Sequence, residues 1–238
     1  MSQKPFVSVV TPTYNRRSFL PNLIYQFNYQ TYPQDRMELL IIDDSAESNE
    51  DIIPKQDNIK YIHLKEKISL GNKRNMLNKL SKGEIIVCFD DDDWYSCERV
   101  HHAVHKLTAN PKIEIAGSTI LHIYYIKLDQ IYQFGPYGPN HSTNGPMAFK
   151  RSYLKNNNYD KTLDKAEESL FTKNFSNQLV QLDPYKTMIC IAHGNNTVDK
   201  DPFITQGKLT KLKIKDFFKK KDHYMLNIIT TLKNNISK

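Results

Sequence analysis

The first hundred residues alternate short apolar runs with segments that have the apolar spacing of an amphipathic helix. Uninterrupted apolar and β-branched runs are typical of strands that are buried on both faces. This alternation predicts a Rossmann-like α/β fold, in which a mostly parallel central sheet carries helices on both faces. The expected strands cover 6–11, 38–42, 61–64 and 84–89, and the expected helices cover 18–30, with Ser18 as N-cap, 72–80 and 97–107.

The second half of the chain has a less regular pattern. Glycine and proline are frequent enough in 134–146 to predict a loop. Apolar spacing predicts a helix over 164–178, and short apolar runs predict strand structure within 113–126 and 186–192. The last segment, 206–238, mixes lysines with apolar residues and is expected to form a basic helical tail.

The net charge of +7 is concentrated in the segment 208–221, and the rest of the chain is close to neutral. The body of the protein therefore lacks the basic surface expected of a nucleic-acid-binding protein. The tail itself has three interpretations: a basic amphipathic helix on an anionic membrane, a helix packed on the core, or a homodimer contact.

Neither a membrane-spanning run nor a signal peptide is recognisable in the sequence. The cysteines, Cys88, Cys97 and Cys190, are odd in number and form no CxxC pair, which is typical of unpaired thiols in a reducing compartment. We therefore expect a cytoplasmic protein that is soluble or peripherally associated with a membrane.

Polar residues follow three of the expected strands at the point where each strand ends. They are the turn 11–16, the pair Asp43-Asp44 and the run Asp90-Asp91-Asp92-Asp93. In open α/β sheets, ligands bind in the crevice outside the carboxyl ends of the strands. The three clusters are therefore expected to face one crevice.

The run of four aspartates, 90–93, requires an explanation because adjacent carboxylates repel one another and raise each other's pKa. A cation should offset this repulsion, and carboxylates suit hard divalent ions such as Mg²⁺ or Mn²⁺. In extended backbone, Asp90 and Asp92 would face one way and Asp91 and Asp93 the other. The alternative is a solvated acidic loop that caps the next helix.

Taken in order, the segments SVVTPTYNR, LLIIDDS and LGNKRNMLNKLSKGEIIVCFDDDDWY closely resemble the family 2 glycosyltransferases, which have the GT-A fold. The match runs from residue 6 to about 105, keeps only landmarks over 110–200 and is absent from the tail. The resemblance implies a GT-A catalytic domain over 1–205, with a nucleotide-binding half (1–105) and an acceptor-binding half (106–205), followed by the tail (206–238).

The resemblance also implies roles for particular residues. Tyr14 would stack on the base, Asp43 would hydrogen-bond it, and Arg74 would reach the base or the phosphates. Asp92 would ligate the metal, and Asp90 or Asp91 would hold the ribose. The full set expected to bind the nucleotide is Thr11, Pro12, Tyr14, Arg16, Asp43, Gly71, Arg74, Asp90 and Asp91.

The family carries an acidic pair at the start of a helix, and its second acid is the catalytic base. Here Glu167-Glu168 occupies that place, with glutamate instead of the usual aspartate, so which of the two is the base stays open. His193 fits the family's metal-binding histidine after the last core strand. The residues expected near the donor and acceptor sugars are Trp94, for which core packing is the alternative, Asn144 and Gly145.

The implied activity is an inverting transfer of a hexosyl or N-acetylhexosaminyl group from a nucleoside diphosphate, with UDP as the expected carrier. The acceptor hydroxyl would belong to a glycan, a lipid-linked sugar or a protein, and Mn²⁺ or Mg²⁺ would assist. Two alternatives remain. One is a non-catalytic homologue that binds nucleotide sugars. The other is a sugar-phosphate nucleotidyltransferase, which is disfavoured because TPTYNRR lacks the glycines of a phosphate loop.

Overall fold

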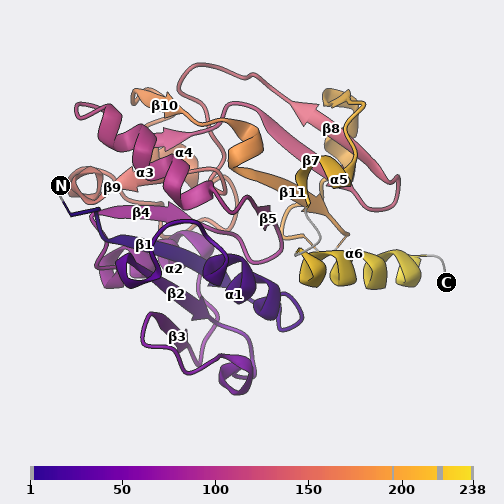
Figure 1. Ribbon diagram of the computed structural model, residues 1–238, viewed down its shortest axis with the longest axis horizontal. Coiled ribbons are helices and arrows are strands. Elements are labelled where there is room, and N and C mark those ends of the chain that lie inside the picture. The colour runs from indigo at the N-terminus through magenta and orange to yellow at the C-terminus, as the bar shows by residue number, and fades with distance from the viewer. Residues whose placement is uncertain (1–2, 195, 219–221, 237–238) are drawn as a thin grey trace.

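The computed structural model describes residues 3–194, 196–218 and 222–236, and its central element is a seven-stranded sheet (Figure 1). Strands β1, β2, β3 and β4 pair in parallel, β6 pairs in parallel with β10, and β9 runs antiparallel to β4 and β6. The expected mostly parallel sheet is therefore confirmed. The strand order is β10 (Leu179–Gln181), β6 (Ile115–Gly117), β9 (Ala148–Lys150), β4 (Ile85–Cys88), β1 (Val7–Thr13), β2 (Met37–Asp43) and β3 (Ile59–His63).

Helices cover both faces of this sheet, as expected. Successive side chains of a strand point to opposite faces. Val9 therefore packs in one apolar cluster with helices α1 (Leu20–Asn28) and α3 (Arg99–Ala109). Its neighbour Val10 packs in another cluster, with α2 (Leu70–Leu80) and α4 (Glu168–Phe171). Short 3-10 helices cover Gln34–Arg36, Glu50–Ile52, Arg151–Lys155, Pro184–Lys186 and Asp201–Gln206.

A second, five-stranded sheet lies beside the first (Figure 1). Its strand β5 follows the acidic run 90–93, which itself follows β4 of the main sheet. The acidic run therefore bridges the two sheets. The strand order is β12 (Lys208–Leu209), β8 (Gln130–Phe134), β7 (Leu121–Tyr125), β11 (Met188–Ala192) and β5 (Trp94–Tyr95).

The basic tail packs on this second sheet. Its strand β12 pairs with β8, and the side chains of Phe217, Phe218 and Met225 are buried against residues of β5, β7 and β11. Helices α5 (Ile214–Phe217) and α6 (His223–Ile236) follow, and α6 lies beside α1 (Figure 1). Packing on the core is therefore the tail interpretation that the structure supports, while lysines 219–221 lie outside the described residues.

The division at residue 205 stays a prediction. It falls inside the 3-10 helix Asp201–Gln206, and residues on both sides of it pack on the same sheet. Among the described residues, no helix combines the length and the apolar character that crossing a membrane requires.

Two local expectations were wrong. The helix predicted over 164–178 is reduced to Glu168–Phe171, because Lys173, Asn174 and Phe175 have left-handed backbone angles, with φ of 51°, 54° and 60°. Ser18 does not cap the first helix: α1 begins at Leu20, and its N-cap position is Phe19, without a side-chain capping bond. In both segments the apolar side chains can pack on the core without a helix that covers the whole predicted range.

Candidate active site

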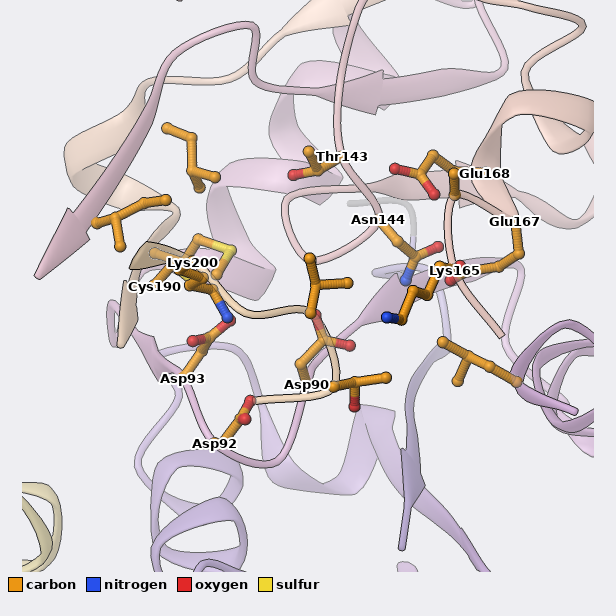
Figure 2. A pocket seen from close by; sticks show the side chains of 18 of the residues that line it. Asp90, Asp92, Asp93, Thr143, Asn144, Lys165, Glu167, Glu168, Cys190 and Lys200 are labelled. Carbon is orange, nitrogen blue, oxygen red and sulfur yellow. The ribbon is translucent and has the colours of Figure 1, made fainter. Parts of the chain in front are cut away.

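A cavity of about 510 Å³ opens beside the carboxyl ends of β1 and β4. A second cavity, of about 480 Å³, adds the turn after β1 and shares six lining residues with the first: Pro12, Leu70, Asp91, Asp164, Lys165 and Thr197. Figure 2 shows the larger cavity, with Asp92 and Asp93 on one side and Glu167 and Glu168 on the other. Its polar lining residues are Arg74, Asp90, Asp91, Asp92, Asp93, Thr143, Asn144, Asp164, Lys165, Glu167, Glu168, Thr197 and Lys200.

The acidic run turns instead of continuing as a strand, so the expected alternation of its side chains is wrong. Residues 91–93 form a turn between β4 and β5. Arg16 consequently lies near two successive carboxylates, 3.9 Å from Asp91 and 3.8 Å from Asp92. Asp93 is directed elsewhere and accepts a hydrogen bond from the backbone N–H of Ile191 (2.8 Å).

The four carboxyl groups differ in the direction of their pKa shifts because their surroundings differ. Burial raises the pKa of Asp90, Asp91 and Asp93, and the charge of Asp92 raises all three further, although Arg74 opposes this at Asp90. Burial also opposes ionisation of Asp92, but the hydrogen bond with His193 and the charge of Lys200 lower its pKa. Asp92 is therefore the carboxylate that stays ionised most readily.

Lys200 is a site residue that sequence reasoning missed. It lines the cavity beside Asp93 and Cys190 (Figure 2), and the surrounding carboxyl groups raise its pKa against the effect of its own burial. The charge of the acidic run indicated that a cation was needed, but the sequence between β11 and Lys200 has no pattern that identifies this lysine as the cation.

Asp92 and His193 meet as a potential pair of metal ligands. The Nε2 atom of His193 lies 3.0 Å from Oδ2 of Asp92, although the two residues are 101 positions apart. Asn196 also donates to Oδ2 of Asp92 (3.1 Å). One carboxylate and one imidazole suit Mn²⁺ or Mg²⁺ if donor phosphates complete the coordination. Within the described parts of the chain, no group of three His, Cys, Asp or Glu side chains is arranged as a metal site.

Arg74 is the buried centre of an ionic network. Its Nε atom donates to Glu167 (2.7 Å) and its Nη2 atom to Asp90 (3.1 Å). Burial opposes the charge of the guanidinium, but these two carboxylates raise its pKa well above the usual value. The amide of Asn144 lies between Arg74 and the hydroxyl of Tyr159. Arg74 therefore ties Glu167 to the acidic run.

Glu168 is placed differently from Glu167. Glu167 is 3% exposed and committed to Arg74, whereas Glu168 is half-buried and faces the cavity at the start of α4 (Figure 2). Burial and the adjacent charge of Glu167 raise the pKa of Glu168. Of the two acids, Glu168 has the exposure and the proton affinity of a general base.

Among the residues predicted to bind the base, Tyr14 lines the second cavity, whereas Thr11 and Asp43 are buried. Tyr14 is 38% exposed and lines the second cavity, with Nζ of Lys67 4.3 Å from its ring centroid. Thr11 is fully buried in β1. Asp43 is fully buried too, and its oxygens accept hydrogen bonds from Ser45, Asn49 and Tyr61, a bonding that lowers its pKa against the effect of burial. Asp43 lines neither cavity in this structure, and its contact with a nucleotide stays a prediction.

Of the three residues predicted to lie near the sugars, two line the cavity and one is buried in the core. Gly145 lines the cavity, and an added Cβ there would lie 3.0 Å from Oδ2 of Asp90. Asn144 lines it too. Trp94 is 4% exposed, and its indole packs against the rings of Phe217 and Phe218, with centroids 6.1 and 5.2 Å away. Core packing is therefore the role that the structure supports for Trp94.

Gly71 has a packing role instead of a position in the cavity. An added Cβ would lie 1.8 Å from the carbonyl oxygen of Asp160, and the N–H of Gly71 donates to the carbonyl oxygen of Leu163 (2.9 Å). The missing side chain lets α2 approach the segment that leads to Glu167 and Glu168.

Gly71→Ala is expected to lower the free energy of unfolding by about 1–3 kcal/mol, because the new methyl group overlaps backbone that cannot move independently. Gly138→Ala is the matched control, since an added Cβ there meets nothing within 4 Å. Thermal or denaturant unfolding of both variants measures the difference. Equal stability of the two variants would contradict the packing role.

Known proteins resemble this chain in sequence and in fold. Glycosyltransferase GlyG of Streptococcus pneumoniae is 32% identical over 92 residues, which are 37% of this chain and 30% of GlyG. The poly(ribitol-phosphate) β-N-acetylglucosaminyltransferase TarS of Staphylococcus aureus is 29% identical over 101 residues, 40% of this chain and 18% of TarS. The chain thus spans less than half the length of these curated relatives.

Solved structures show the same GT-A fold. The structure of TarS 1–349 in complex with UDP-GlcNAc superposes with a TM-score of 0.62 at 19% identity, covering 95% of this chain and 66% of that one. The mannosyltransferase PcManGT of Pyrobaculum calidifontis, in complex with GDP-Man and Mn²⁺, superposes with a TM-score of 0.60 at 17% identity, covering 80% and 57%.

The acidic run and the acid pair both lie within one segment that matches a known family. A family model described as glycosyl transferase family 2 matches residues 8–168, well over half of the 238 residues. This chain therefore belongs to glycosyl transferase family 2.

Proposed function

We propose that the protein transfers a hexosyl or N-acetylhexosaminyl group from a nucleoside diphosphate donor to an acceptor hydroxyl, with inversion at the anomeric carbon. The observation that carries this proposal is one cavity lined both by the acidic run 90–93 and by Glu168. The acidic run is suited to the diphosphate side of the donor and Glu168 to the acceptor side. The inverting stereochemistry, the identity of the nucleotide-sugar donor and the use of a divalent metal ion are all parts of this proposal.

The reaction is a single displacement. Glu168 accepts the proton of the acceptor hydroxyl, whose oxygen forms the new bond to the anomeric carbon. The bond between that carbon and the diphosphate oxygen breaks, and the nucleoside diphosphate leaves with the electron pair. Attack from the side opposite the leaving group inverts the anomeric centre and requires no covalent enzyme intermediate. The raised pKa of Glu168 makes it a stronger base than an exposed carboxylate.

The donor is oriented by residues of both cavities. Tyr14 offers its ring to the base in the second cavity, and Arg16 lies where it can contact the diphosphate as well as Asp91 and Asp92. Asp92 and His193 would hold Mn²⁺ or Mg²⁺, which supplies Lewis-acid stabilisation of the leaving diphosphate when bound. Lys200 adds a fixed positive charge to the same region.

UDP is the proposed carrier, since the GT-A neighbour TarS is known in complex with UDP and with UDP-GlcNAc. A hydrolysis screen tests this: the protein is incubated with Mn²⁺ and single nucleotide sugars, including UDP-GlcNAc, UDP-glucose and GDP-mannose. We expect slow release of UDP from at least one UDP-sugar and none after chelation of the metal. Release of no nucleoside diphosphate from any donor, with or without an acceptor mixture, would refute the enzyme proposal and favour a binding homologue.

The pH dependence of turnover should reflect the position of Glu168. A general base must be deprotonated, so activity is present above its pKa and is lost as the pH falls through it. Because burial and Glu167 raise this pKa, the acidic limb of kcat is expected at higher pH than an exposed glutamate would give. Glu167→Gln removes one of the two causes and should move the limb to lower pH. A limb that moves upward or stays in place in this variant would contradict the assignment.

A further inference from the structure

One wall of the larger cavity is apolar. It is built by Leu121 and Ile123 of β7, Phe134 of β8, Met188 of β11 and Phe203 of the 3-10 helix Asp201–Gln206. Apolar side chains such as these do not supply the hydrogen bonds that sugar hydroxyls need, and burying those hydroxyls without partners costs free energy. This wall is therefore suited to an apolar group, in contrast to the acidic run and Glu168 in the same cavity.

The apolar lining continues to exposed side chains. Tyr137, Val198 and Phe203 line the cavity and remain 56%, 38% and 42% exposed. Single exposed apolar residues are ordinary on protein surfaces, but a group of them at a cavity marks a binding surface. Because these side chains line the cavity and are also exposed to solvent, the apolar lining of the cavity reaches the protein surface.

Positive charge adjoins this wall. Gly207 packs on Phe134 so closely that an added Cβ would lie 2.6 Å from the ring, and the next residue, Lys208, is exposed. Lys200 lines the cavity itself. An anionic group between a sugar and an apolar chain would thus find a cation, Lys208, close to Phe134 of the wall.

We propose that the acceptor is a sugar carried on an apolar chain through an anionic linker such as a phosphate. The acceptor hydroxyl lies at Glu168, and the chain lies on Leu121, Ile123, Phe134, Met188, Val198 and Phe203. This inference rests on the proposed transferase function, because it places the acceptor in the same cavity. It selects the lipid-linked sugar over the free glycan and the protein side chain.

The test compares two glucosides that differ only in the apolar chain. Methyl and octyl β-glucoside, the latter below the concentration at which micelles form, are titrated calorimetrically into the full chain with UDP and Mn²⁺. We expect the octyl compound to bind at least about tenfold more tightly, because its chain buries apolar surface on the wall. Val198→Ser/Phe203→Ser should reduce this ratio to about one. Leu128→Ser is the matched control, as Leu128 is 48% exposed in the turn between β7 and β8.

Two results would overturn the inference: equal binding of the two glucosides by the unaltered protein, or an unchanged ratio in the double variant with an unchanged melting temperature. A ratio that falls equally in Leu128→Ser would also overturn it, because the effect would then not belong to this wall. The donor screen on the same preparation separates the proposals. Donor hydrolysis without an octyl preference refutes the acceptor inference alone. An octyl preference without hydrolysis of any donor refutes the transferase and, with it, the assignment of the bound compound as an acceptor.

Discussion

Replacing Glu168 by glutamine is expected to lower turnover by about 10²–10⁴-fold while binding of the nucleoside diphosphate is kept. Glutamine preserves the shape of the side chain but cannot accept the acceptor proton. Glu168 is half-buried and faces the cavity, whereas Glu167 is held by Arg74, so a loss of turnover with UDP binding kept should be specific to Glu168. Initial rates with saturating donor, together with calorimetric binding of UDP, measure the two effects separately.

Glu50→Gln is a matched control because Glu50 is exposed on a short 3-10 helix away from both cavities. It should leave turnover unchanged. Glu167→Gln should also reduce turnover, but through a looser Arg74 and with weaker donor binding. Near-normal turnover of Glu168→Gln would exclude this residue as the base. If only Glu167→Gln lost turnover without losing UDP binding, the roles of the two acids would be reversed.

Asp92→Ala is expected to lower the affinity for UDP in the presence of Mn²⁺ by about 10²-fold or more. A metal bridge to the diphosphate contributes several kcal/mol, and each 1.4 kcal/mol corresponds to a factor of about ten in affinity. Asp92 is the carboxylate of the acidic run whose pKa is lowered, and it lies 3.0 Å from His193, so its loss removes half of the proposed ligand pair. Titration calorimetry with and without Mn²⁺ measures the change.

The unaltered protein without metal should bind UDP as weakly as Asp92→Ala does with metal. Asp57→Ala, which removes an exposed aspartate in a turn, should behave as the unaltered protein. An affinity of Asp92→Ala that still rises on addition of Mn²⁺ would show that the metal is held elsewhere. If the metal leaves UDP binding by the unaltered protein unchanged, the diphosphate would instead be neutralised by cationic side chains that line the two cavities, such as Lys200, Arg16 and Arg74.

The alternation of apolar runs with helical spacing was sufficient to predict the main sheet and its covering helices. Burial periodicity is a local property, and parallel strands with short connections leave few arrangements. The acidic run could be placed at a strand end by the same local reading, whereas the roles of Asp92, His193 and the acid pair 167–168 came from the resemblance to the family and stay predictions, although Asp92 and His193 do lie in contact. Local signals could not predict where the helix over 164–178 stops, because the left-handed conformation of residues 173–175 depends on tertiary packing.

The sequence by itself determined the layered α/β architecture and the edge of the sheet at which polar residues gather. It also determined that this edge is acidic. The tertiary structure alone decided which side chains reach the cavity. Arg74 is paired with Glu167 from 93 residues away, Asp43 and Trp94 are withdrawn into the core, and Lys200 and the apolar wall are brought in from the second sheet and the segment after it. Contacts between distant residues depend on how the two sheets pack, and no local pattern of residues encodes that packing.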